Sequence, residues 1–122
     1  MLTSNIVLTD KSVNNNSKKN LEGFLRHILV SIRAAIEAGN AILQVYRSAD
    51  FKVEQKAHKS PLTLADRNAH DVIMQHLSNF DIPVLSEEGK HTPYDERKIW
   101  GTFWLVDPLD GTKEFIKKNY YK

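Results

Sequence analysis

The sequence contains no cysteine, which excludes a disulfide framework, a thiolate metal site and a cysteine nucleophile. The sequence also has no large excess of either charge, because it contains 17 basic and 15 acidic residues. This balance gives no bulk attraction to nucleic acid or to a membrane surface. No apolar run approaches the roughly 20 residues of a membrane-spanning helix, and the polar N-terminus lacks a signal-peptide core. We therefore expect a cytoplasmic protein whose binding sites are local.

The size of the chain suits one ordinary domain, because it has 122 residues and 41% of them are apolar. The N-terminal part of the chain is more polar than the rest. Residues 14–20 form a polar tract that buries too little apolar surface to offset the entropy lost on ordering. The sequence therefore predicts a flexible polar leader over residues 1–20, with at most a weakly extended segment at residues 6–8.

Two later stretches have the apolar spacing of amphipathic helices. From residue 21 to Tyr46, apolar side chains recur at steps of three and four, which predicts one long helix. Gly39 lies inside it and costs about 1 kcal/mol relative to alanine, so we expect a close packing contact there. A second helix is predicted to begin at Thr63 and to end near Phe80. Because Thr63 and Asp66 are spaced like an N-cap and its N3 partner, a purely structural role for Asp66 stays open.

Three short strands are expected, at residues 51–54, 82–86 and 102–106. The last has little polarity, which favours a central place in the sheet. The middle strand runs into Glu87 and Glu88. When strands of a mixed sheet end side by side, the residues that follow them meet at one edge, where sites form. A solvated acidic turn is the alternative interpretation of Glu87 and Glu88.

The strand at residues 102–106 leads into the most informative residues of the chain, which are Asp107, Pro108, Leu109, Asp110, Gly111 and Thr112. Two carboxylates so close together raise each other's pKa unless a cation lies between them. Magnesium is the natural candidate, since it prefers carboxylate and carbonyl oxygens. Pro108 is expected to end the strand. A short helix should follow at residues 113–116, with free N–H groups suited to phosphate. An ordinary Asp-Gly turn remains the alternative.

Four segments in this order, residues 60–66, 85–88, 104–112 and 113–116, resemble the inositol-monophosphatase superfamily of magnesium-dependent, lithium-sensitive phosphatases. Within it, the continuation Lys113, Glu114 and Phe115 is similar to the bisphosphate-nucleotidase branch. The likeness runs from about residue 39 to residue 119. It implies an α/β, layered α+β fold: the N-terminal part of an αβαβα sandwich, with two long helices packed on a mostly antiparallel or mixed sheet.

The resemblance also implies roles for individual residues. The magnesium ligands would be Glu87, Asp107, the Leu109 carbonyl and Asp110, and the full-length family would bind two or three ions. Asp66 and Thr112 would orient or deprotonate the attacking water. The substrate would contact Glu87, Leu109, Asp110, Gly111 and Thr112, with the last two offering N–H groups to phosphate.

The substrate implied by the resemblance is a small nucleotide, adenosine 3',5'-bisphosphate, hydrolysed to AMP and phosphate. The sulfated form, 3'-phosphoadenylyl sulfate, would be a second substrate, and the role would be to clear a by-product of sulfate assimilation. Neither a nucleic-acid partner nor an integral membrane segment is expected. Peripheral association with the cytoplasmic face of the inner membrane stays open.

Family members continue into a second half that carries another metal ligand, whereas this sequence stops at Lys122. We therefore interpret residues 21–122 as the N-terminal portion of a phosphatase domain without its C-terminal half. The strand at residues 103–106 should then have an unpaired edge, open to self-association. Two other hypotheses remain: an inactive remnant that binds metal or phosphate weakly, and a phosphatase for inositol or sugar phosphates.

Overall fold

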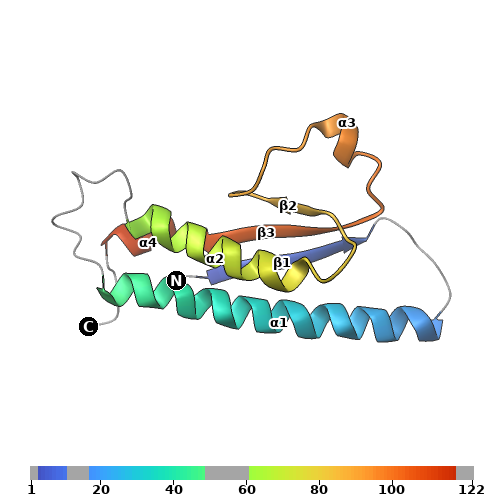
Figure 1. The fold of residues 1–122 in the computed structure, drawn as a ribbon, viewed down its shortest axis with the longest axis horizontal. Coiled ribbons are helices and arrows are strands. Elements are labelled where there is room, and N and C mark those ends of the chain that lie inside the picture. Colours follow the sequence, from blue (N-terminus) through green and yellow to red (C-terminus); the bar gives the residue numbers. More distant parts are fainter. Residues whose placement is uncertain (1–2, 11–16, 49–60, 118–122) are drawn as a thin grey trace.

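The computed structural model describes residues 3–10, 17–48 and 61–117 (Figure 1). In chain order, the elements are β1 (Thr3–Asp10), α1 (Ser17–Ser48), α2 (Pro61–Leu77), β2 (Val84–Ser86), α3 (Tyr94–Arg97), β3 (Thr102–Asp110) and α4 (Thr112–Lys117). The predicted α/β fold, with two long helices on a small mixed sheet, is confirmed. The strand expected at residues 51–54 lies outside the described residues.

The sheet has three strands in the order β1-β3-β2, so β3 is central as predicted. Its pairing is antiparallel with β1 and parallel with β2. The expectation of an unpaired edge at residues 103–106 is therefore wrong, because both sides of β3 carry a hydrogen-bonded neighbour. Within the described part of the chain, β1 and β2 are the outer strands, and any pairing with another chain would begin there.

The flexible leader predicted for residues 1–20 is wrong for residues 3–10, which form β1. Ile6 and Leu8 lie partly buried against the core. They alternate with the exposed Asn5 and Val7, which is the period of a half-buried strand. The partner strand β3 begins at Thr102, so this strand is stabilised by a distant segment and not by its local composition.

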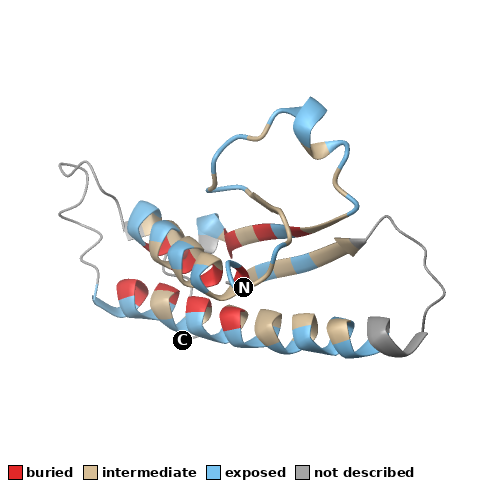
Figure 2. Cartoon of the chain, turned by 45° about the vertical axis from the view of Figure 1, so that its right-hand side comes forward, coloured by how far each residue is buried: buried red, intermediate tan, exposed pale blue. Residues whose placement is uncertain are grey.

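The helices α1 and α2 run antiparallel and cover one face of the sheet (Figure 1). Figure 2 shows the buried residues on the facing sides of α1, α2 and β3. This core is made of Ala38, Ile42, Val45, Tyr46, Ala65, Ala69, Ile73, Leu77, Trp104, Val106, Leu109 and Phe115. The alanines allow the two helices to approach closely, while the large side chains of β3 and α4 fill the space above them.

The second helix begins at Pro61, two residues before the predicted start. Proline suits the first position of a helix because its ring presets φ and its missing N–H would have had no helical partner. Thr63 and Asp66 consequently lie inside α2. The interpretation of Asp66 as the partner of an N-cap at Thr63 is therefore wrong, because the helix starts before Thr63.

Gly39 does not mark the close packing contact that we expected. A Cβ built at this position would meet nothing within 4 Å, apart from the helix's own backbone. The glycine therefore interrupts a run of better helix formers without an evident packing reason.

The segment Leu21–Ser48 of α1 is long and apolar enough to cross a membrane, with a mean hydropathy of 1.4 over its most apolar window. Only 22% of that window is buried. One such helix is weak evidence, because core helices of globular proteins pass the same test. The expectation that the chain has no integral membrane segment stays a prediction.

Candidate functional site

The ends of β2 and β3 bring two predicted site segments together. The strands are parallel, and Ser86 lies opposite Val106. One step further, the Glu87 N–H donates a hydrogen bond of 3.0 Å to the Val106 carbonyl. This bond places Glu87 beside the start of the Asp107 segment, as the sequence predicted.

Contrary to the prediction, β3 does not end before Pro108 but continues to Asp110. Asn5 pairs with Asp107 and Thr3 pairs with Asp110. One residue of β1, Ser4, therefore faces two residues of β3, which is the geometry of a β-bulge. Proline is tolerated at a bulge because its missing N–H is not needed by the ladder.

The chain turns sharply after the bulge. Gly111 has φ of 86°, a left-handed conformation that glycine adopts without steric cost. Its N–H donates a hydrogen bond of 2.9 Å to Oδ1 of Asp110. The Gly111 carbonyl accepts a bond of 3.0 Å from the Phe115 N–H, and α4 starts at Thr112 as the sequence indicated. Phe115 is completely buried, so it anchors the turn to the core.

Asp66 approaches the same edge from α2. Burial is the main cause that raises the pKa of its carboxyl to about 6, and the negative charges of Glu88 and Glu87 add to the shift. Asp107 contributes a smaller repulsion in the same direction. Repulsion of this kind acts only between groups that lie near one another, so Asp66 belongs to the same cluster of charges.

The pKa of the Glu87 carboxyl is raised above its ordinary value. The main cause is a side-chain interaction with Asp107, and the negative charge of Asp107 is the next. A small desolvation of Glu87 and the charges of Glu88 and Asp110 act in the same direction. Two carboxylates this close repel one another, and a cation bound between them would remove that repulsion.

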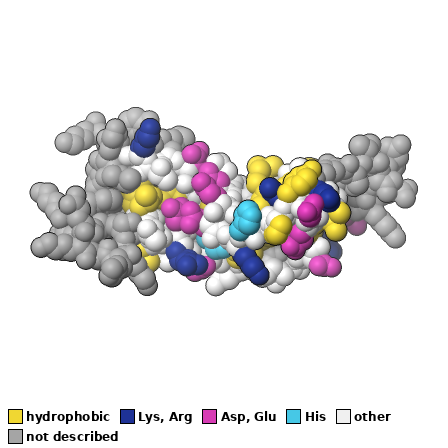
Figure 3. Space-filling model, turned by 90° about the horizontal axis from the view of Figure 1, so that it is seen from above, with side chains coloured by type: hydrophobic (Ala, Val, Ile, Leu, Met, Phe, Trp, Pro, Cys, Tyr) yellow, Lys and Arg dark blue, Asp and Glu magenta, His cyan; other side chains and the backbone are white. Residues whose placement is uncertain are grey.

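We call Asp66, Glu87, Glu88, Asp107 and Asp110 the acidic edge. Figure 3, which views the molecule from above, shows one group of acidic side chains near the middle of this face and another at its right, among basic and hydrophobic side chains. The edge combines the ends of α2, β2 and β3, and it includes four of the residues that the sequence proposed. Leu109 and Thr112 flank it: the Leu109 side chain is buried and Thr112 is exposed.

The donor chemistry of the acidic edge suits a hard divalent cation, which binds carboxylate oxygens. Oδ1 of Asp107 is buried and has no hydrogen-bond partner among the described residues. A buried acceptor without a partner is costly, and a cation would remove that cost. Within residues 3–10, 17–48 and 61–117, however, no three acidic, histidine or cysteine side chains converge as a complete metal-binding group.

Three contacts at this edge were missed by the sequence interpretation. The ring of His70 on α2 lies 3.0 Å from Ser86 Oγ, so it ties α2 to the end of β2 next to Glu87. Ser4 Oγ donates a bond of 2.9 Å to the Pro108 carbonyl. Asn5 Nδ2 donates a bond of 3.4 Å to Oδ2 of Asp110. Nothing local in the sequence signals these contacts, because each joins segments that meet only in the folded sheet.

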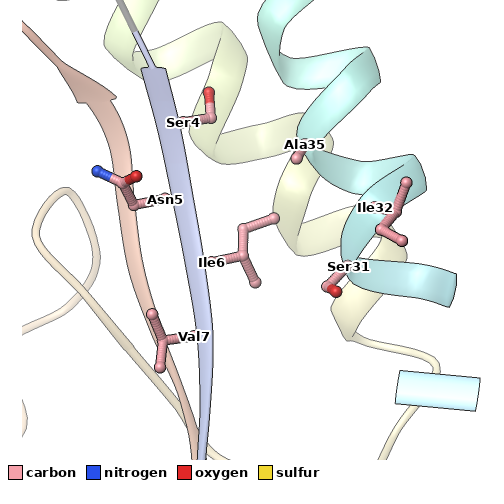
Figure 4. Close-up of a pocket in the computed structure, with 7 residues that line it drawn as sticks. All are labelled: Ser4, Asn5, Ile6, Val7, Ser31, Ile32 and Ala35. Atoms are coloured by element: carbon pink, nitrogen blue, oxygen red, sulfur yellow. The ribbon is translucent and has the colours of Figure 1, made fainter. Parts of the chain in front are cut away.

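A separate hollow of about 260 Å³ lies between β1 and α1. Figure 4 shows Ile6 pointing from β1 toward α1, while Asn5 and Val7 point away from it. The hollow is lined by Ser4, Asn5, Ile6, Val7, Ser31, Ile32 and Ala35, without any charged side chain. It offers nothing to a cation or a phosphate, so the acidic edge is the stronger candidate site.

Comparison with known proteins gives one family match. The model of the "Inositol monophosphatase family" matches residues 25–121. The sequence is 54% identical over 88 residues to the 3'(2'),5'-bisphosphate nucleotidase CysQ of Escherichia coli O157:H7, covering 70% of this chain and 35% of the relative. It is 38% identical over 87 residues to the CysQ of Haemophilus influenzae, covering 32% of that protein.

A solved structure shows the same likeness. The crystal structure of CysQ from Bacteroides thetaiotaomicron, a bacterial member of the inositol monophosphatase family, superimposes with a TM-score of 0.70 at 50% sequence identity. The match covers 77% of this chain and 34% of that one. The chain thus spans about a third of the length of the relatives that it matches.

Proposed function

Since this chain belongs to the inositol monophosphatase family, we propose that its acidic edge binds magnesium and takes part in the hydrolysis of adenosine 3',5'-bisphosphate to AMP and phosphate. 3'-Phosphoadenylyl sulfate is the proposed second substrate. The two curated relatives reported above are named 3'(2'),5'-bisphosphate nucleotidases, which supports a nucleotide over an inositol or sugar phosphate. The observation that carries the proposal is the convergence of Glu87 and Asp107 at the ends of two parallel strands.

The residues that would hold magnesium are Glu87, Asp107, the Leu109 carbonyl and Asp110. Carboxylate and carbonyl oxygens are the ligands that this ion prefers. Bound there, magnesium would supply activation of water and neutralisation of phosphate charge. Oδ1 of Asp107 has no hydrogen-bond partner among the described residues, so it would gain most directly from a bound ion.

Asp66 is the proposed group that orients or deprotonates the attacking water, together with the Thr112 hydroxyl. A carboxyl group with a pKa of about 6 changes protonation near neutral pH, which suits proton transfer. The backbone N–H groups of Gly111 and Thr112 are the proposed phosphate donors. In the present conformation the Gly111 N–H is bonded to Asp110, so phosphate binding would require exchange of that partner.

The test is release of inorganic phosphate from adenosine 3',5'-bisphosphate by the purified 122-residue chain. We expect release that requires magnesium, is inhibited by lithium and is lost in Asp110→Asn. Inositol 1-phosphate, assayed in parallel, should be hydrolysed more slowly.

Two outcomes would contradict the proposal in different ways. Folded chain that binds magnesium but releases no phosphate would refute hydrolysis by this chain and favour a remnant that only binds metal. Faster hydrolysis of inositol 1-phosphate would refute the assigned substrate. Circular dichroism of each sample separates these outcomes from simple misfolding.

A further inference from the structure

The strand β1 spans Thr3–Asp10 and so lies outside residues 25–121, the segment that matches the family. It nevertheless contacts the most acidic part of the chain. Its pairing with β3 extends from Asp10 opposite Thr102 to Thr3 opposite Asp110. A segment without counterpart in the family match therefore lies directly against the proposed metal ligands.

The bulge opposite Ser4 decides which way Asp110 faces. Along β3, Trp104, Val106 and Pro108 are buried, whereas Leu105 is exposed and Asp107 is half-buried. Regular alternation would turn residue 110 toward the core. The extra residue at the bulge shifts the alternation by one. Leu109 is consequently 3% exposed, and Asp110 is exposed on the side of Asp107.

Ser4 fixes this bulge through its side chain. Its hydroxyl donates a hydrogen bond of 2.9 Å to the carbonyl of Pro108, in a partly buried position. Bulged residues are left out of the regular ladder, so their polar groups need other partners. The Ser4 hydroxyl provides such a partner for the carbonyl of Pro108.

Asn5 acts on the carboxylate itself. Its Nδ2 donates a bond of 3.4 Å to Oδ2 of Asp110, while the Gly111 N–H donates to Oδ1. Each oxygen of this carboxylate therefore accepts a hydrogen bond, one from β1 and one from the turn. Because each bond fixes one oxygen, the two together restrict rotation of the side chain.

We propose that Ser4 and Asn5 are positioning residues that hold Asp110 on the same side of the sheet as Asp107. They do so from a strand that lies outside the family-matched segment. This inference rests on the proposed function, because it assigns the positioned carboxylate to a magnesium site. Restricting a ligand in its binding orientation strengthens binding by reducing the entropy lost when the ion binds.

The first test measures binding of Mn²⁺, used as a paramagnetic probe of the magnesium site, to the full 122-residue chain. Asn5→Val keeps a side chain suited to a strand but removes the donor, and Ser4→Ala removes the hydroxyl. Val7→Ala is the matched control, since Val7 lies on the same face of β1 opposite Leu105. We expect dissociation constants about two- to tenfold higher for Asn5→Val and Ser4→Ala, and unchanged for Val7→Ala. Equal affinities for all four proteins would overturn the proposal.

The second test needs no metal. The amide resonance of Gly111, which reports its bond to Asp110, should shift in Asn5→Val and Ser4→Ala but not in Val7→Ala. Protected β1 amides would show that the strand remains paired. An unchanged Gly111 resonance overturns the positioning roles whatever the metal result. Wild-type chain that binds no Mn²⁺ refutes the metal assignment instead, so the two failures are distinguishable.

Discussion

The two sides of β3 have opposite chemistry. On the inner side, Trp104 and Val106 are 1% and 2% exposed and pack against apolar residues of α1 and α2. On the outer side, the negative charge of Asp107 helps to raise the pKa values of Asp66 and Glu87, and that of Asp110 helps to raise the pKa of Glu87. The inner side therefore supplies stability, whereas the outer side brings together charges of one sign, which costs stability. This contrast predicts opposite responses to mutation.

The largest effect is expected for Trp104→Ala on the inner side. Removing a buried tryptophan leaves a cavity and should lower the free energy of unfolding by about 3–5 kcal/mol. The indole also makes an edge contact with His27, with ring centroids 5.7 Å apart. The measurement is urea denaturation followed by circular dichroism.

Leu105→Ala is the matched control on the outer side, because Leu105 is 44% exposed. It should change the free energy of unfolding by about 0.5 kcal/mol or less. Equal losses in the two variants would show that the two sides of β3 do not differ as described.

The second prediction concerns the pH dependence of stability. The pKa of Asp66 is raised from 3.8 to about 6 in the folded chain, so the folded state binds more protons than the unfolded state between these values. The free energy of unfolding should therefore fall as the pH rises from about 4 through about 6, and this contribution should then level off. Denaturation midpoints at a series of pH values measure the effect.

Asp66→Asn should flatten this dependence, since the variant has no group that titrates at this position. The raised pKa of Glu87 acts in the same direction and would leave a residual slope. Stability that increases across this window, or an identical slope in Asp66→Asn, would contradict the assigned environment of Asp66.

A small effect of the opposite sign is expected far from both sides of β3, at Gly39. Alanine would meet nothing within 4 Å there, so Gly39→Ala should raise the free energy of unfolding by about 0.5–1 kcal/mol. Gly111→Ala is the contrasting variant: its φ of 86° strains any residue with a Cβ, and stability should decrease. Melting temperatures of the two variants should move in opposite directions, and a decrease in both would refute the packing described for Gly39.

The sequence predicted the parts of the fold that depend on local pattern. The periodicity of residues 21–46 indicated α1, and the apolar residues before Asp107 indicated a central strand. The strand β1 was missed because residues 3–10 pair with a segment about 100 residues later, which no local pattern reveals. The same holds for the start of α2, where Pro61 begins the helix and Thr63 had the better cap chemistry.

For the candidate site, residue types and their order predicted that Glu87 and Asp107 follow neighbouring strands and meet at one edge of the sheet. Asp66 was assigned to the same site only through the resemblance to the family. Residue types and their order did not predict that a bulge turns Asp110 outward, because its direction depends on the register with β1. The contact of His70 with Ser86 was missed for a similar reason: it requires α2 to lie across β2. Register and helix placement are properties of the folded chain.

The central claim is that the acidic edge is a cation site, and the most direct test is the melting temperature of wild type and Asp107→Asn with and without magnesium at constant ionic strength. Without magnesium, Asp107→Asn should melt at or above the temperature of the wild type, because a repulsive charge is removed. Magnesium should raise the melting temperature of the wild type alone. Equal shifts in both proteins, or no shift in either, would contradict the claim.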